Sequence, residues 1–209
     1  MSIKINLIAV IYVLFISVNG LLSKDLLVGN IIYVLSIIIF TFVVVIYVNG
    51  FDDKYKSEVV LNSFPIDRRN IVRSKYITLI IFILISSAAI IALTNILPML
   101  LNIDGKASAS IQTVIIAANI LLLFYSIYYP IYFKVGEGLR TFNTILWLLM
   151  MLAPSLLVKF LKTLDQRGLL EKLMNIALQN INLYLLVISL VIYYISLQIS
   201  KRIYMKREF

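Results

Sequence analysis

Six long stretches without a charged side chain divide the sequence, and they constrain the fold more than any other feature. An ionised side chain at the centre of a bilayer costs about 2.5 to 3.5 kcal/mol, so apolar windows of this kind predict membrane crossings. Each window supplies roughly the 17 to 25 residues that a spanning helix needs. Within these windows we expect helices at residues 5–23, 28–49, 76–99, 110–133, 141–158 and 180–200.

The composition agrees with a bilayer environment, because 62% of the 209 residues are hydrophobic and the mean hydropathy is +1.00. The apolar runs show no alternation with period two, which excludes the strands of a membrane β-barrel. No repeat, low-complexity segment or linker interrupts the chain. The predicted fold is therefore all-α, a polytopic membrane protein with six transmembrane helices in a single domain, residues 1–209.

The net charge of +9 concerns topology rather than nucleic-acid binding. If the N-terminus lies inside, thirteen of the 19 Lys and Arg residues fall in inside segments and six fall in outside segments. Inside loops of membrane proteins carry such an excess of Lys and Arg, so we expect both termini in the cytoplasm. The chain is not expected to bind nucleic acid.

The residue types that most enzymes need are missing. The sequence has no Cys and no His, no phosphate-binding Gly-rich loop, and no Asp, Glu, Lys or Arg inside the six windows. We therefore expect no metal site, no cofactor and no catalytic residue in this chain. Energy for uphill transport has to come from another protein, which favours a permease subunit.

The connection between spans two and three, residues 52–75, is long and patterned. Asn62 and Ser63 can cap helices, Pro65 suits a first helical turn and Asp67 favours a helix N-terminus, so we expect two short helices here. Two interpretations stay open. The segment is either an amphipathic elbow on the lipid headgroups or a docking helix for a cytoplasmic partner.

Four tyrosines share one face of the fourth span at spacings i, i+3, i+4 and i+7. Tyrosine collects at membrane interfaces for structural reasons, but such a face can also line the path of an amphipathic substrate. Pro130 should kink this helix before a charged turn. The substrate-path candidates are Tyr125, Tyr128, Tyr129, Tyr132 and Asn119, and the turn contains Lys134, Gly136, Glu137 and Arg140. Residues 159–172 are predicted to form an amphipathic helix in the outer interface, either a surface or a re-entrant one.

Two motifs carry a resemblance to a known family. The first is residues 53–76, acidic residues followed by Leu61-Asn62-Ser63-Phe64-Pro65-Ile66-Asp67-Arg68-Arg69 and then Ile71-Val72-Arg73-Ser74-Lys75-Tyr76. The second is the turn Pro130-Ile131-Tyr132-Phe133-Lys134-Val135-Gly136 with Arg140. Together with the six-span layout, they resemble the transmembrane subunits of bacterial type-2 ABC exporters, in particular short permeases of peptide or bacteriocin export and immunity, similar to the phenol-soluble-modulin exporters. Asp67, Phe64 and Gly138 depart from the residues expected in these motifs.

The resemblance implies that residues 53–75 dock an ABC ATPase subunit. It implies ATP and Mg²⁺ in that subunit, a second permease subunit, identical or related, and a place in the bacterial cytoplasmic membrane. The implied docking residues are Glu58, Leu61, Phe64, Pro65, Ile66, Arg68, Arg69 and Arg73. Residues 159–172 would then belong to an external cap near spans five and six.

The apolar spans and the tyrosine face favour a hydrophobic or amphipathic substrate, most simply a peptide. Two other functions stay open at this point. An immunity or accessory protein could bind a membrane-active peptide without transporting it, and it would not need the docking segment. An intramembrane enzyme is disfavoured because acid and base groups are missing from the spans.

Overall fold

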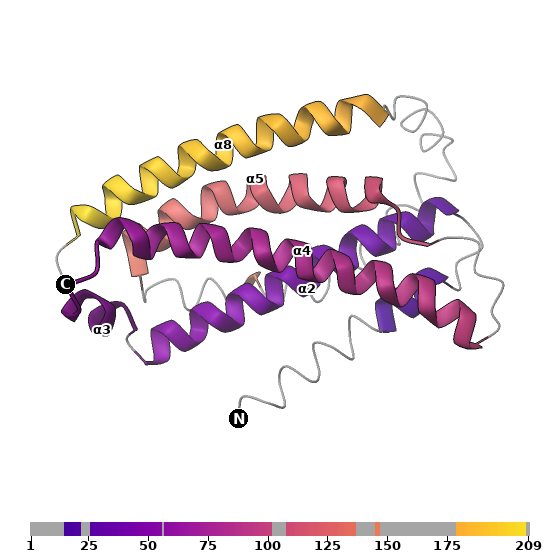
Figure 1. Cartoon of the computed structure of the whole chain (residues 1–209), viewed down its shortest axis with the longest axis horizontal. Coiled ribbons are helices and arrows are strands. Elements are labelled where there is room, and N and C mark those ends of the chain that lie inside the picture. Colours follow the sequence, from indigo (N-terminus) through magenta and orange to yellow (C-terminus); the bar gives the residue numbers. More distant parts are fainter. Residues whose placement is uncertain are drawn as a thin grey trace.

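The computed structural model describes residues 15–21, 26–55, 57–101, 108–136, 145–146 and 179–207. Within these ranges all regular structure is helical, as predicted, and there is no strand. The elements are α2 (Leu26–Lys54), α3 (Ser57–Ser63), α4 (Arg68–Leu101), α5 (Ile111–Val135) and α8 (Gln179–Met205) (Figure 1). Residues 15–21 are helical as well.

Four of the described helices are long and apolar enough to cross a membrane, namely Val28–Asp52, Arg68–Met99, Ile111–Val135 and Ile181–Met205. They coincide with the predicted second, third, fourth and sixth spans. The predicted first span, 5–23, is described over residues 15–21, and the predicted fifth span, 141–158, lies outside the described residues apart from 145–146.

The connection between α2 and α4 differs from the prediction of two separate short helices. One short helix, α3, is present, but no second short helix starts near Pro65. The chain stays non-helical as far as Asp67, whose carboxylate accepts a hydrogen bond of 2.9 Å from the backbone N–H of Arg69. Asp67 therefore caps α4, which runs on without a break to Leu101.

Helix α4 is longer than a bilayer is thick, and this places its first turns at the membrane surface. At about 1.5 Å per residue, its 34 residues extend over roughly 50 Å, compared with a hydrocarbon core of about 30 Å. The predicted span 76–99 is thus the apolar part of a helix that begins eight residues earlier. Those added residues carry Arg68, Arg69, Arg73 and Lys75.

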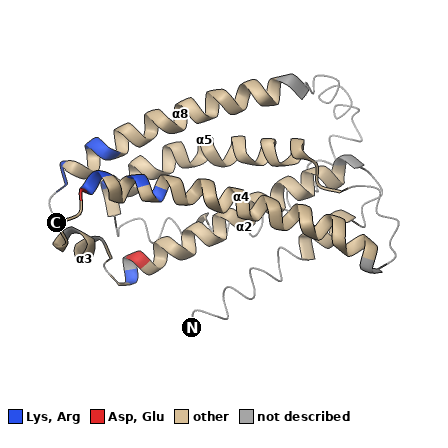
Figure 2. Cartoon of the chain, viewed as in Figure 1, with Lys and Arg blue, Asp and Glu red and all other residues tan. Residues whose placement is uncertain are grey.

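The four long helices form a bundle with one charged end. Helices α2, α5 and α8 finish at the end where α4 starts, and α3 and the last described residues lie there too (Figure 1). Every Lys and Arg in the described part of the chain lies at this end (Figure 2). An uncharged bundle with charges gathered at one end matches the segregation that sets membrane topology, so we refer to it as the charged end.

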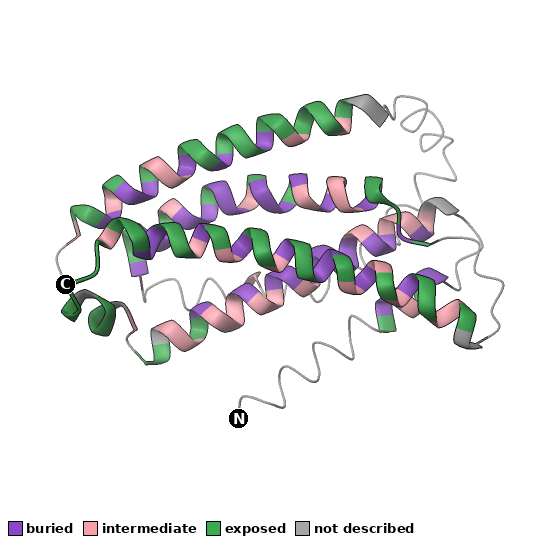
Figure 3. Cartoon of the chain, in the orientation of Figure 1, coloured by how far each residue is buried: buried purple, intermediate pink, exposed green. Residues whose placement is uncertain are grey.

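The core runs along the inner faces of α2, α4 and α5, where the buried residues concentrate (Figure 3). Helix α8 packs mainly on α5 and leaves most of its outer face exposed (Figure 3). Near the middle of the bundle, Thr41 of α2 and Ser86 of α4 share a hydrogen bond of 2.6 Å between their hydroxyls. This contact is one of the neutral interhelical bonds that membrane bundles use in place of charges.

Candidate functional site at the charged end of the bundle

An exposed apolar knob projects from the charged end. It consists of α3 and the four residues after it, which we call the knob, residues 57–67. Phe64 is 56% exposed and Ile66 44% exposed, and Leu61 and Pro65 are exposed as well. The side chain of Glu58 lies outside the described set. Large apolar side chains placed beyond the end of the spanning helices favour contact with another protein.

The three arginines of the predicted docking set lie just after the knob, and two of them reach the end of α8. Arg68 donates from Nη1 to the backbone carbonyl of Arg207 at 3.1 Å. The Nε of Arg69 lies 3.3 Å from Sδ of Met205. Arg73 is exposed one turn further along α4. The start of α4 is therefore attached to the C-terminal segment rather than free in solvent.

Lys75 connects α4 to two other helices. Its ammonium donates to Oδ1 of Asn49 at 2.8 Å and forms an ion pair with the carboxylate of Asp52, both on α2. It also lies 5.6 Å from the centroid of the Tyr132 ring on α5. The side chains of the pair are 18% and 28% exposed, so water only partly screens this contact.

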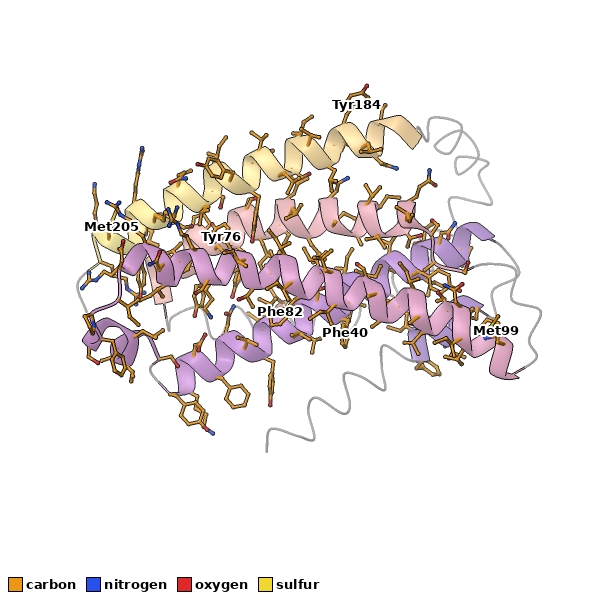
Figure 4. All side chains as sticks on the ribbon, in the orientation of Figure 1. Phe40, Tyr76, Phe82, Met99, Tyr184 and Met205 are labelled. Carbon is orange, nitrogen blue, oxygen red and sulfur yellow. The ribbon has the colours of Figure 1, made fainter. Side chains whose placement is uncertain are left out.

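Tyr76 is the next residue of α4 and connects it to α8. Its hydroxyl lies 2.8 Å from Oγ of Ser196 and 2.7 Å from Oγ of Ser200. The hydroxyl of Tyr193 donates to the Tyr76 carbonyl at 2.9 Å. Figure 4 shows Tyr76 inside the bundle toward its charged end. Ser196, Ser200 and Tyr193 lie on one face of α8, so a single helix face supplies all three partners.

Pro130 determines the direction of these hydrogen bonds. A proline has no N–H, so the carbonyl of Ser126, four residues earlier, lacks its helical donor. The hydroxyl of Ser196 donates to that carbonyl at 2.6 Å. Because a serine has one proton to donate, Ser196 accepts from Tyr76, and Tyr76 in turn accepts from Ser200. The proline, expected to kink the helix, lies within a continuous α5. It leaves the Ser126 carbonyl free to accept a hydrogen bond from α8.

The tyrosine face of α5 is buried inside the subunit. Tyr125, Tyr129 and Tyr132 are each 1% exposed and Tyr128 is 5% exposed. The ring of Tyr129 lies 4.8 Å from that of Tyr76, and its hydroxyl donates to the Lys75 carbonyl at 3.3 Å. These contacts assign the face to packing in the described state. Its role in lining a substrate path stays a prediction.

The remaining candidates on α5 lie on either side of the tyrosine face along the helix. Asn119, in the half of the helix nearer the uncharged end, donates from Nδ2 to the Asn182 carbonyl of α8 at 3.1 Å. At the charged end, Gly136 ends α5 with φ +63°, and its N–H donates to the Tyr132 carbonyl. Lys134 is exposed. Glu137 and Arg140 of the predicted turn lie outside the described residues, as does the predicted amphipathic helix 159–172.

Arg207 packs against the end of α5, beside Gly136, whose positive φ is the reason that a glycine is favoured there. Its Nη1 lies 3.5 Å from the Phe133 carbonyl, an interaction that suits the negative end of a helix dipole. A Cβ added to Gly136 would lie 2.2 Å from Nη2 of Arg207. The C-terminal segment thus contacts both α4, through Arg68, and α5.

The sequence did not reveal several residues that hold this end together. Asn49, Asp52, Tyr76 and Tyr193 were not among the predicted site residues, and neither were the serines of α8. One signal was available, because Tyr193, Ser196, Ser200 and Tyr204 recur at helical spacing within an otherwise apolar span. Their partners on α4 and α5 could not be identified from spacing.

The described polar residues of this site form structural contacts between helices. Among the described residues no group of His, Cys, Asp or Glu side chains could hold a metal ion. Polar contacts across helices connect the start of α4 to α2, α5 and α8. They comprise the ion pair of Lys75 with Asp52, the hydrogen bonds described above and the ring contact of Tyr76 with Tyr129.

These features define a multi-pass helical membrane protein with an exposed knob at its charged end. A family model described as ABC-2 family transporter protein matches residues 1–205. The chain therefore belongs to the ABC-2 transporter family. No curated protein and no solved structure matches it.

Membership of this family makes the chain a permease subunit of an ABC transporter in a cell membrane. A permease of this family is the transmembrane component of the transporter and is not itself catalytic. Membership of the family therefore implies an ABC ATPase as the partner of this chain.

Proposed function

We propose that this chain is the transmembrane subunit of an ATP-driven exporter that moves a hydrophobic or amphipathic peptide across the bacterial cytoplasmic membrane. A separate ATPase subunit docks on residues 53–75, and two permease subunits, identical or related, enclose the path. Both termini and the charged end face the cytoplasm. The carrying observation is the exposed knob at the charged end, next to the helix contacts that can transmit a force.

The docking proposal assigns different roles to the predicted docking residues. Phe64, Ile66 and Leu61 offer exposed apolar surface that can fill a pocket on the ATPase. Arg69 is exposed at the edge of the knob and can pair with acidic groups there. Arg68 is half-buried against the Arg207 carbonyl, so it holds the end of α8 in place as well.

Force transmission follows from the contacts of Lys75 and Tyr76. They lie about two turns into α4, immediately beyond the docking arginines. Lys75 fixes α4 to α2, the Tyr129 hydroxyl fixes it to α5, and Tyr76 fixes it to α8. ATP-driven closure of the partner would pull the knob and tilt these helix ends as one unit, since packed interfaces move between discrete arrangements.

The substrate class is supported by the chemistry of the spans. The described helices carry charges at one end and neutral or apolar side chains elsewhere. An ion or a sugar needs a set of converging polar ligands along its path, whereas an amphipathic peptide can pass over apolar surface. The tyrosine face would contribute to this path when the helices separate during the transport cycle.

The test is a knob variant compared with a matched control. Phe64→Asp places a charge in the proposed ATPase pocket, and Val135→Asp places the same charge on another exposed apolar residue at the charged end. Loss of a central hot-spot residue typically costs at least about 2 kcal/mol, or roughly thirtyfold in affinity. We expect Phe64→Asp to lose most of the ATPase subunit that co-purifies from native membranes, and with it most of the peptide-stimulated ATP hydrolysis. Val135→Asp should keep both near the wild-type level.

Both variants should insert in the membrane and elute as the wild type does from gel filtration. Equal ATPase recruitment by Phe64→Asp and wild type would refute the docking assignment. Protection of cells against a membrane-active peptide, retained after deletion of the knob and without any ATPase, would instead identify an immunity protein. Transport of a labelled amphipathic peptide into inverted vesicles with ATP tests the substrate class.

A further inference from the structure

Three cations lie near one another where α4 begins and α8 ends, and no described acidic side chain is paired with them. Lys201 follows Ser200 directly, and its side chain is buried, with 7% of the residue exposed. The charged groups that act on its ammonium are the guanidinium groups of Arg73 and Arg69, both of the same sign. In the part of the chain that the structure describes, neither Lys201 nor Arg73 forms an ion pair or a side-chain hydrogen bond. We call these three residues the cation triad.

Three cations that lie close together repel one another, and an anion among them relieves that repulsion. The bundle covers the aliphatic part of Lys201, while its ammonium reaches the surface. Asp67 lies near Arg69 in the chain, but it is exposed, and it accepts from the backbone N–H of Arg69 as the helix cap. The described carboxylate of Asp52 is paired with Lys75. Among the described residues, no carboxylate is therefore paired with the triad.

The surface next to the triad is apolar and continues toward the middle of the membrane. On α4, Ile77, Ile80 and Leu84 follow Arg73 at helical spacing on the same side, and they are 56%, 39% and 62% exposed. On α8, Tyr194 and Leu190 follow Lys201 in the same way, at 61% and 45% exposed. Figure 3 shows the exposed outer sides of both helices.

The position of the triad agrees with the depth of a lipid headgroup. Lys201 lies in the last turns of the candidate span Ile181–Met205, and Arg73 lies in the first turns of Arg68–Met99. A charge at this depth meets the phosphate layer of the bilayer, with hydrocarbon directly beyond it. An anionic head with an apolar tail matches the triad and the adjoining stripe in both charge and orientation.

We propose that Lys201, Arg73 and Arg69 form a site for an anionic phospholipid, whose phosphate sits among the three cations while an acyl chain lies on the exposed sides of α4 and α8. Bound lipid would neutralise the gathered positive charge and connect the start of α4 to the end of α8. Arg69 and Arg73 are also predicted docking residues, whereas Lys201 belongs to the lipid site alone and Phe64 to the knob alone.

The test uses the full-length protein in nanodiscs of phosphatidylcholine, with and without phosphatidylglycerol. Native mass spectrometry measures how many phosphatidylglycerol molecules stay bound after release, and thermal unfolding measures the stabilisation. A charged hydrogen bond is worth about 1.5 to 3 kcal/mol, so we expect Lys201→Met and Arg73→Gln each to lose about tenfold or more in preference for phosphatidylglycerol. Lys134→Gln removes an exposed charge of α5 at the charged end and should change the preference for phosphatidylglycerol little.

A second readout covers the folding of the variants. Lys201→Met removes one of three mutually repelling charges and keeps a side chain of similar length, so this variant should be at least as thermostable as wild type in pure phosphatidylcholine. It should gain nothing when phosphatidylglycerol is added, whereas wild type gains stability. Inorganic phosphate at matched concentration should stabilise wild type far less, because it lacks the acyl chain.

Each contrary result has a distinct meaning. Equal retention of phosphatidylglycerol by wild type and Lys201→Met would overturn the lipid site. Equal stabilisation by inorganic phosphate would also overturn it in favour of a small-anion site. Loss of ATPase recruitment in Lys201→Met and Arg73→Gln, with lipid retention unchanged, would assign the triad to the ATPase interface. Phe64→Asp should keep its lipid, so failure of knob docking and failure of the lipid site are separable.

Discussion

Pro130 leaves the carbonyl of Ser126 without its helical donor, and Ser196 of α8 supplies the missing proton at 2.6 Å. This arrangement predicts that Ser196→Ala lowers the free energy of unfolding, and that the size of the loss depends on Pro130, which lies on another helix. The alanine removes the donor and leaves the Ser126 carbonyl unpaired in the bundle. Tyr76 keeps a partner, because its hydroxyl also lies 2.7 Å from Oγ of Ser200 and can donate to it instead. The loss is therefore confined to one carbonyl.

The magnitude follows from what that carbonyl loses. A buried acceptor left unsatisfied costs about 1 to 3 kcal/mol in water-soluble proteins, and interhelical hydrogen bonds in membranes reach about 1.7 kcal/mol. We expect Ser196→Ala to lower the free energy of unfolding by about 1.5 kcal/mol. In a Pro130→Ala background, residue 130 regains an N–H and donates to the Ser126 carbonyl within α5. The same serine substitution should then cost about 0.5 kcal/mol or less.

The assay is a double-mutant cycle on the purified chain, with unfolding followed by circular dichroism as a denaturing detergent replaces a mild one. The two substitutions should couple by about 1 kcal/mol. Ser36→Ala is the control, since the Ser36 hydroxyl donates at 2.9 Å to the Ile32 carbonyl of its own helix. That substitution should not couple to Pro130→Ala. Additivity of Ser196→Ala and Pro130→Ala within about 0.5 kcal/mol would refute this explanation of the proline.

Two further predictions concern the links around Lys75 and Gly136. Lys75→Met should lower thermal stability and uncouple ATP hydrolysis from transport, because it leaves the Asp52 carboxylate half-buried and unpaired. The double variant Lys75→Met with Asp52→Asn should recover part of the stability. No recovery would mean that loss of the ion pair is not the cause. Gly136→Ala should cost about 1 to 2 kcal/mol of unfolding free energy, chiefly because φ is +63°, and the new Cβ also requires the Arg207 guanidinium to move. Adding Arg207→Ala should relieve the collision but not the backbone strain, so complete rescue in thermal unfolding would contradict this reasoning.

The charge-free windows were enough to predict the long helices. Hydrophobic runs of this length determine where a chain can cross a bilayer, since every backbone polar group in lipid has to be satisfied inside a helix. Four described helices are long and apolar enough to cross a membrane, and they overlap the second, third, fourth and sixth predicted windows. The prediction was wrong at the start of α4, because Pro65 suggested a separate helix whereas Asp67 caps one continuous helix.

Side-chain partners could not be predicted in the same way. The spacing of the tyrosines on α5 showed that they share a face, but spacing does not reveal what packs against that face. In the structure it is covered by neighbouring helices, with Tyr129 against Tyr76 of α4. The docking arginines likewise point to a partner by charge, yet Arg68 and Arg69 reach the end of α8.

The sequence by itself therefore determined the membrane-spanning helices, the segregation of charge to one end and the absence of His and Cys, because each depends on residue type along the chain. The tertiary structure alone decided which distant residues meet. Ser196 lies 70 positions from the carbonyl that it satisfies, and Lys201 lies 128 positions from Arg73. Contacts at such separations depend on how helices pack, and many arrangements of apolar helices have similar energies in lipid, so their specific polar contacts become visible only in the folded bundle.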